Sequence, residues 1–104
     1  MQIQINTDHN IDGHERLAEH VRGVVEDSLS RFSTHITRVE VHLSDQNAAR
    51  GGPDDKRCMM EARLEHHSPT AVTHQAASVH EAVDGAAEKL KRAVEHLVGK
   101  LHAH

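Results

Sequence analysis

Cations recur along one side of the segment EKLKRAVEHLVGK, residues 88–100. At about 100° per residue, a helix places four of its basic side chains within one sector roughly 80° wide. We call these four residues the basic row: Lys89, Arg92, His96 and Lys100. Ammonium and guanidinium groups gathered on one surface bind phosphate oxygens, and imidazole joins them when it is protonated. The spacing therefore indicates an anion-binding surface.

A plainer interpretation of the same segment stays open. Acidic residues gather in a separate sector, and acids early with bases late complement the helix dipole by about 0.3–1 kcal/mol per charge. A charged outer face is also what any surface helix needs. The basic row becomes a stronger candidate if other cations extend it. The chain offers Lys91 on the same helix and three arginines in two predicted strands: Arg38, Arg57 and Arg63.

The overall charge limits the kind of partner. The chain of 104 residues has 12 Lys and Arg against 16 Asp and Glu, a formal net charge of −4. This balance argues mildly against a partner that is polyanionic over the whole contact area. The sign depends on pH, because protonation of all 12 histidines would raise the charge from −4 to +8. Phe32 is the one Phe, Tyr or Trp, so we do not expect a surface that stacks nucleobases on exposed rings.

Hydrophobic alternation with a period of two residues predicts the strands that would position these cations. In ITRVEVHLSD, residues 36–45, the alternation places Val39, Val41 and Leu43 on a buried face and polar residues on the other. The stretch at 46–55 has the Gly, Pro and Asp content of a flexible connection. The four predicted strands cover residues 1–6, 36–45, 56–67 and 71–76, and the pattern in the last one is the weakest.

Apolar residues at three- and four-residue spacing predict two amphipathic helices, over 13–32 and 79–101. A capping box opens each of them, formed by Asp12 with Glu15 and by Ser78 with Glu81. Gly85 and Gly99 each weaken the second helix by about 1 kcal/mol relative to Ala. That helix must therefore be packed against the rest of the molecule to hold its shape.

These elements predict an α+β fold: a four-stranded sheet with two helices packed on one face, in the order β-α-β-β-β-α, as a single domain over residues 1–104. The other face of the sheet is left in water. Cys58 falls on the core face, where it is a small buried hydrophobe. The wet face would carry Arg38, Glu40, His42, Arg57, Glu61 and Arg63.

Other function classes have less support. Imidazole suits zinc, nickel or copper, and a metal site could be assembled from His66, His67, His102 and His104. Because no Cys or acidic cluster completes a tetrahedral site, we predict no metal and no cofactor. Catalysis needs a nucleophile and a base held together in a cleft, which the pattern does not offer, so we expect no enzyme. A single Cys and the lack of an apolar run of about 18 residues predict a cytoplasmic protein with no membrane partner.

The segment SVHEAVDGAAEKLKRAV resembles the start of the last helix in the ribosome hibernation-promoting factors, also called ribosome-associated inhibitor or ribosomal subunit interface proteins. The positions that match are Val79, Ala82, Val83, Asp84, Lys89, Leu90 and Arg92. The resemblance extends through MQIQI, the first helix and THITRVEVHLS. His80 stands where the family usually has Tyr, and the acids Glu26 and Asp27 stand where Lys or Arg is usual.

This resemblance implies a short-form hibernation factor that binds the small ribosomal subunit in the channel for messenger and transfer RNA. It implies no catalysis and no cofactor. The rRNA phosphates would be paired by Lys89, Arg92, Lys100, His96, Lys91, Arg38, Arg57 and Arg63. An alternative keeps the fold and changes the role. An acidic relative could bind another protein or form a homodimer through the open sheet face, where Arg38 and Arg63 alternate with Glu40 and Glu61.

Overall fold

A computed structural model of the chain describes residues 1–8, 11, 14–45 and 55–101. Its elements are β1 (Gln2–Thr7), α1 (His14–Leu29), β2 (Ile36–Asp45), β3 (Lys56–Leu64), β4 (Thr70–Ala76) and α2 (Val79–Leu101). The strands form one sheet in the order β1-β2-β3-β4, with β1 parallel to β2 and the other neighbours antiparallel. The predicted element order and four-stranded sheet are confirmed.

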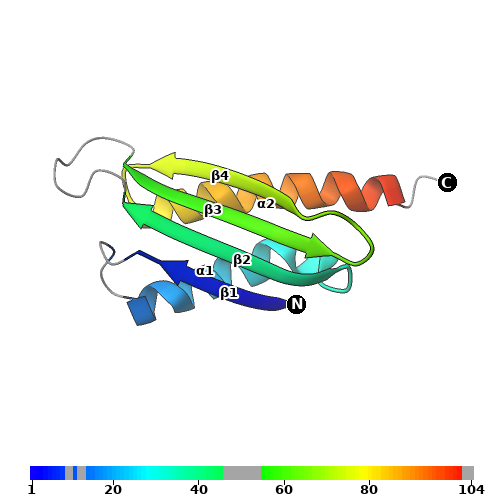
Figure 1. Ribbon diagram of the computed structural model, residues 1–104, viewed down its shortest axis with the longest axis horizontal. Coiled ribbons are helices and arrows are strands. Elements are labelled where there is room, and N and C mark those ends of the chain that lie inside the picture. The colour runs from blue at the N-terminus through cyan, green and yellow to red at the C-terminus, as the bar shows by residue number, and fades with distance from the viewer. Residues whose placement is uncertain (9–10, 12–13, 46–54, 102–104) are drawn as a thin grey trace.

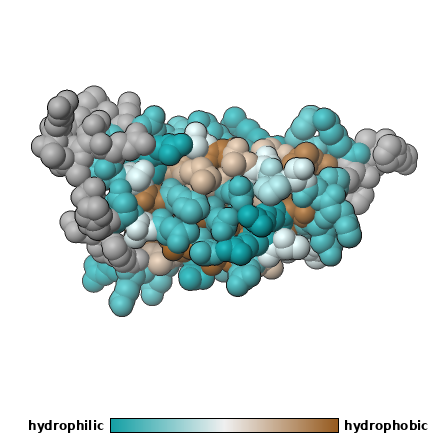
Figure 2. Space-filling view, viewed as in Figure 1, coloured by the Kyte–Doolittle hydropathy of each residue, from teal (hydrophilic) through white to brown (hydrophobic). Residues whose placement is uncertain are grey.

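Both helices lie on the same face of the sheet, side by side behind the strands (Figure 1). The core lies between these two layers. Val39 and Val41 from β2, Met60 from β3, and Leu90 and Val94 from α2 have no exposed surface. Because side chains alternate along a strand, the intervening residues face away from the helices. Figure 2, viewed from the same side, shows polar side chains over most of this open sheet face. The predicted division into a covered face and a wet face is confirmed.

The structure corrects the predicted strand over 56–67, because β3 ends at Leu64. The chain then turns at Glu65 and His66, and the N–H of His67 donates to the carbonyl oxygen of Leu64 at 3.2 Å. His66 has a φ of 63°, a left-handed conformation that no strand contains. His66 and His67 therefore lie in a turn and not in the predicted strand.

The helix boundaries agree with the sequence pattern with one refinement. The α-helical hydrogen bonding of α1 ends at Leu29, and a 3₁₀ turn (Ser30–Phe32) carries the chain on to the buried Phe32 ring. Ser78 caps α2, since its Oγ accepts a hydrogen bond from the N–H of Glu81 at 3.1 Å. The other predicted cap residue, Asp12, and the connection at 46–54 lie outside the described residues.

Candidate nucleic-acid interface

The basic row lies on the flank of α2 that borders the outer strand β4. The Nζ of Lys89 donates a hydrogen bond to the backbone oxygen of Thr73 at 2.9 Å, which shows that this flank borders β4. His96 and Lys100 follow Lys89 at two- and three-turn spacing, so they lie on the same flank. All four side chains of the row are exposed. We call this surface the α2–β4 flank.

Close packing brings β4 and α2 together at the beginning of this flank. A Cβ on Gly85 would lie 2.1 Å from Cδ2 and 2.3 Å from Nε2 of His74, a residue of β4. The imidazole ring therefore occupies the space that a side chain at position 85 would need. Sequence reasoning treated Gly85 as a weak point of the helix, whereas its lack of a side chain lets the sheet and helix approach each other.

Arg92 has an acidic neighbour one turn away. Its Nε lies 3.3 Å from Oε1 of Glu88, and the two side chains are 75% and 55% exposed. An exposed pair at this spacing contributes only about 0.3–0.5 kcal/mol. The guanidinium also keeps other N–H donors that face solvent. The ion pair therefore weakens the positive field of Arg92 without preventing contact with a phosphate.

The second half of the row surrounds a shallow hollow of about 490 Å³. A Cβ on Gly99 would meet nothing within 4 Å, so this position leaves open space between the longer side chains. The residues lining the hollow are Arg92, Glu95, His96, Gly99 and Lys100. Three of the five can be cationic, and one is an acid. The hollow therefore places up to three cationic groups around open space.

Lys91 lies apart from the basic row. It follows Asp84 by seven residues, about two turns, and so shares a side of α2 with it. The Oδ1 of Asp84 lies 3.7 Å from Nε2 of His20 on α1, so this side of α2 faces the other helix. The structure thus separates Lys91 from the α2–β4 flank, although sequence reasoning grouped them.

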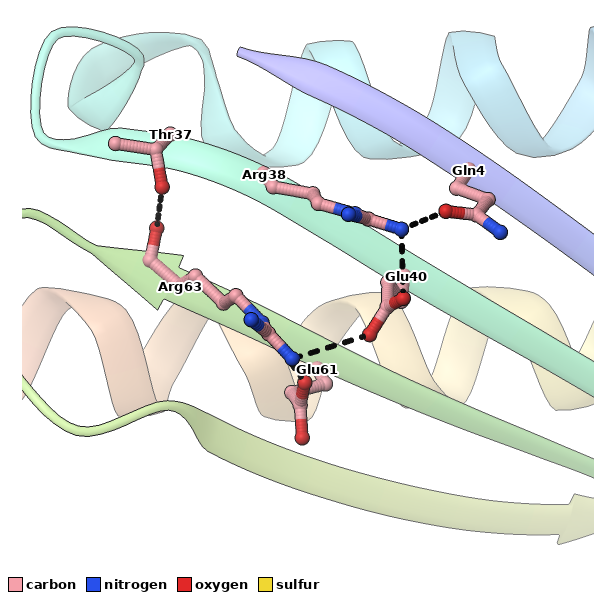
Figure 3. A network of polar contacts seen from close by, with 6 residues as sticks. All are labelled: Gln4, Thr37, Arg38, Glu40, Glu61 and Arg63. Carbon is pink, nitrogen blue, oxygen red and sulfur yellow. Dashed lines mark hydrogen bonds and ion pairs between the residues drawn. The ribbon is translucent and has the colours of Figure 1, made fainter.

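Two of the three arginines on the open sheet face are engaged with carboxylates (Figure 3). The Nη2 of Arg38 donates to the side-chain oxygen of Gln4 and to Oε1 of Glu40, the latter at 2.9 Å. Arg63 lies 3.8 Å from Glu40 and 3.4 Å from Glu61. The antiparallel register places Arg38 opposite Arg63 and Glu40 opposite Glu61, so each arginine lies within reach of a carboxylate. The charges of this network largely compensate one another.

Arg57 occupies a different part of the same face. It is exposed on β3, in register with Ser44 on β2 and Gln75 on β4. Within the residues that the structure describes, no carboxylate forms an ion pair with it. Arg57 is therefore a more suitable phosphate partner than Arg38 or Arg63, but the sheet separates it from the α2–β4 flank.

Sequence reasoning missed a polar contact between the helices. The rings of His20 and His80 are stacked, with centroids 4.2 Å apart and planes inclined by 20°. The Nε2 of His20 is buried and has no hydrogen-bond partner among the described residues. Nothing in the spacing of positions 20 and 80 could have signalled this contact, because it depends on how α1 and α2 pack.

Two other reactive groups are unsuited to binding or catalysis. Lys56 is paired with Asp55 at 2.7 Å and Asp45 at 3.4 Å. The hydrogen bond that the Nζ of Lys56 donates to Asp55 raises the pKa of Lys56, with Asp45 adding to the effect. Burial raises the pKa of the Cys58 thiol to about 12. Cys58 therefore stays protonated at neutral pH, in agreement with its predicted place in the core.

The metal-site hypothesis gains no support from the part of the chain that the structure describes. No group of three or more His, Cys, Asp or Glu side chains there could hold a metal ion. His66 and His67 are exposed in the turn after β3, while His102 and His104 lie outside the described ranges. Among the same residues, no helix has the length and apolar character needed to cross a membrane.

Comparison with known proteins yields one family and several related folds. The sequence matches the family described as sigma 54 modulation protein / S30EA ribosomal protein over residues 3–102. The N-terminal domain of Protein Y from Thermus thermophilus has a TM-score of 0.74 and 18% identity, covering 93% of this chain and 99% of that one. A ribosomal subunit interface protein from Coxiella burnetii has a TM-score of 0.70 and 16% identity, covering 95% and 99%. No curated protein matches the sequence.

Proposed function

The chain belongs to the sigma 54 modulation protein / S30EA ribosomal protein family, and from that premise we propose that it binds the small ribosomal subunit and holds it inactive. The protein would occupy the channel for messenger and transfer RNA and so exclude both. This action needs no bond to be made or broken, only a rigid body of the right shape held by phosphate contacts. The names of two proteins with the same fold, Protein Y and a ribosomal subunit interface protein, agree with this role.

The observation that carries the proposal is the segregation of charge on α2. The chain is acidic overall, yet the α2–β4 flank presents Lys89, Arg92 and Lys100 in one line, with His96 between the last two. Contacts from such side chains to phosphates position a protein on RNA without reading its sequence. A folded body with one cationic flank can therefore bind rRNA while its acidic remainder faces elsewhere.

We rank the candidate contacts by the groups that surround them. Arg92, His96 and Lys100 come first because they surround the hollow. Lys89 follows, since one of its three donors is already used by Thr73. Arg57 is a separate candidate on the sheet. The remaining predicted contacts are weaker, either because carboxylates compensate them or because they face α1: Arg38, Arg63 and Lys91.

The alternative role as a self-associating module loses its main argument. It relied on unlike charges pairing across a two-fold axis, whereas Arg38, Glu40, Glu61 and Arg63 already pair within one molecule (Figure 3). A second copy would have to compete with those contacts. We therefore favour ribosome binding and treat self-association as one outcome of the test.

Co-sedimentation with purified small subunits tests the proposal. We expect Lys100→Glu to weaken binding and to reduce the slope of log K against log salt by more than the roughly 0.7–0.9 expected for one lost phosphate contact. Lys91→Glu is the matched control, since it makes the same charge change on the same helix but on the side facing α1. Equal losses in the two variants would contradict the assignment of the flank. Salt-insensitive behaviour with a dimer in sedimentation would favour the alternative.

A further inference from the structure

Two imidazoles lie within the α2–β4 flank. His96 is exposed between Arg92 and Lys100 in the hollow. His74 reaches the flank from β4, with its ring against the backbone of Gly85. Gly85 lies one turn before Lys89, and Lys89 donates a hydrogen bond to Thr73, the residue next to His74. The His74 ring therefore lies near the N-terminal end of the basic row. From one end to the other the flank carries His74, Lys89, Arg92, His96 and Lys100.

Two acids reduce the positive charge of this surface. Lys89, Arg92 and Lys100 are always cationic, but Glu88 pairs with Arg92 and Glu95 lines the hollow. The surface is therefore cationic, and further positive charge would strengthen its attraction for a polyanion. Each imidazole that gains a proton adds one more positive charge to the surface.

Neighbouring elements add little charge to the flank. The sequence of β4, TAVTHQA, contains no acid and no ionisable group apart from His74. Beneath it, His74 is in register with the buried Cys58 of β3. Glu81 lies one turn before Gly85 on α2, and the turn after β3 carries the exposed Glu65, His66 and His67. The strand β4 therefore contributes His74 and no other ionisable group to the flank.

On the basis of the proposed function, we infer that proton uptake by His74 and His96 strengthens the binding of RNA phosphates by the α2–β4 flank. Imidazoles as a class change charge between about pH 5 and 8. Acidification of the surroundings would then tighten binding without any change of fold. The flank would then bind RNA phosphates in a proton-dependent way, with Arg92 and Lys100 contributing the rest of its positive charge.

Binding of the full chain to purified small subunits at about pH 6 and about pH 7.5, over a series of salt concentrations, tests the inference. We expect several-fold tighter binding in the more acidic buffer, with a salt slope steeper by roughly 1. His96→Lys places a permanent charge at the centre of the flank. It should bind tightly at both pH values and so lose much of the difference, whereas His96→Gln should bind weakly at both.

His67→Gln is the matched control, because it removes an exposed imidazole from the turn outside the flank. It should keep the wild-type response to pH. His74→Gln should reduce the response, with circular dichroism confirming that the packing against Gly85 has not cost the fold. The inference is overturned if both His96 variants retain the full pH response, or if His67→Gln abolishes it. Salt-dependent binding that is equal at both pH values would overturn only this inference, whereas absence of binding at both would overturn the proposed function as well.

Discussion

Replacing Gly85 by Ala should destabilise the protein, although the same change in an ordinary helix stabilises it. Helix propensity alone favours Ala over Gly by about 1 kcal/mol. Against this gain, the new Cβ would lie 2.1, 2.3 and 2.6 Å from three atoms of the His74 ring. Real Cβ contacts essentially never come closer than 3.0 Å, so the ring has to move. Overpacking of this kind costs about 1–3 kcal/mol, which leaves a net loss of roughly 0–2 kcal/mol.

Gly23 supplies the matched control, because it lies in the middle of α1, is exposed, and has nothing within 4 Å of its would-be Cβ. Gly23→Ala should therefore raise the free energy of unfolding by about 0.5–1 kcal/mol. Urea denaturation followed by far-ultraviolet circular dichroism measures both variants. For a domain of this size, each 1 kcal/mol also shifts the melting temperature by roughly 4–8 °C.

A double-mutant cycle separates the steric cost from other effects. In a His74→Ala background the ring is gone, so Gly85→Ala should become stabilising by about 1 kcal/mol, as it is at position 23. If Gly85→Ala stabilises the wild-type protein as much as Gly23→Ala does, the packing of His74 against the helix is not as described. A loss that persists when His74 is absent would refute the same reasoning.

Three further outcomes test other parts of the structure. Cys58 should resist alkylation in the folded protein at mildly alkaline pH and react readily in concentrated guanidinium, because burial raises the pKa of its thiol to about 12. Complete alkylation of the folded protein, detected by mass spectrometry, would contradict this. Lys56→Gln should lower stability at neutral pH, because it removes the ammonium group that donates to the buried Asp55 at 2.7 Å. Since the pKa of Lys56 is raised above 10.5 on folding, the deficit should shrink in urea titrations above that pH. Ser78→Ala should cost about 1 kcal/mol through loss of the cap on α2, with Ser78→Asp restoring stability in thermal melts.

The fold could be predicted because hydrophobic periodicity reports directly which face of each element is buried. The alternation of Val39, Val41 and Leu43 predicted β2 over the same residues, 36–45, that the structure assigns to it. The prediction for β3 was wrong at its end, since the sequence beyond Leu64 lacks a strong stop signal until Pro69. The left-handed backbone at His66 is a property of the hairpin geometry, and no residue type there demands it.

The candidate site was less predictable because it depends on contacts between elements. A helical wheel placed the four residues of the basic row together, but it could not tell which flank borders β4. The register that pairs Glu40 with Glu61 decides that Arg38 and Arg63 are compensated. Composition shows only that both signs are present on those strands. Tertiary packing alone brings His74 into the flank.

The contact between Lys89 and Thr73 bears on how the protein avoids self-association through its outer strand. An outer strand exposes backbone groups to which a strand from another chain can add, and lysines are a common means of discouraging such growth. By occupying a carbonyl of β4, Lys89 obstructs the start of an intermolecular ladder. Exchanging it for an acid would remove a cation and unblock the strand in one step. Light scattering should therefore accompany any binding study of a Lys89 variant, so that aggregation is not mistaken for loss of affinity.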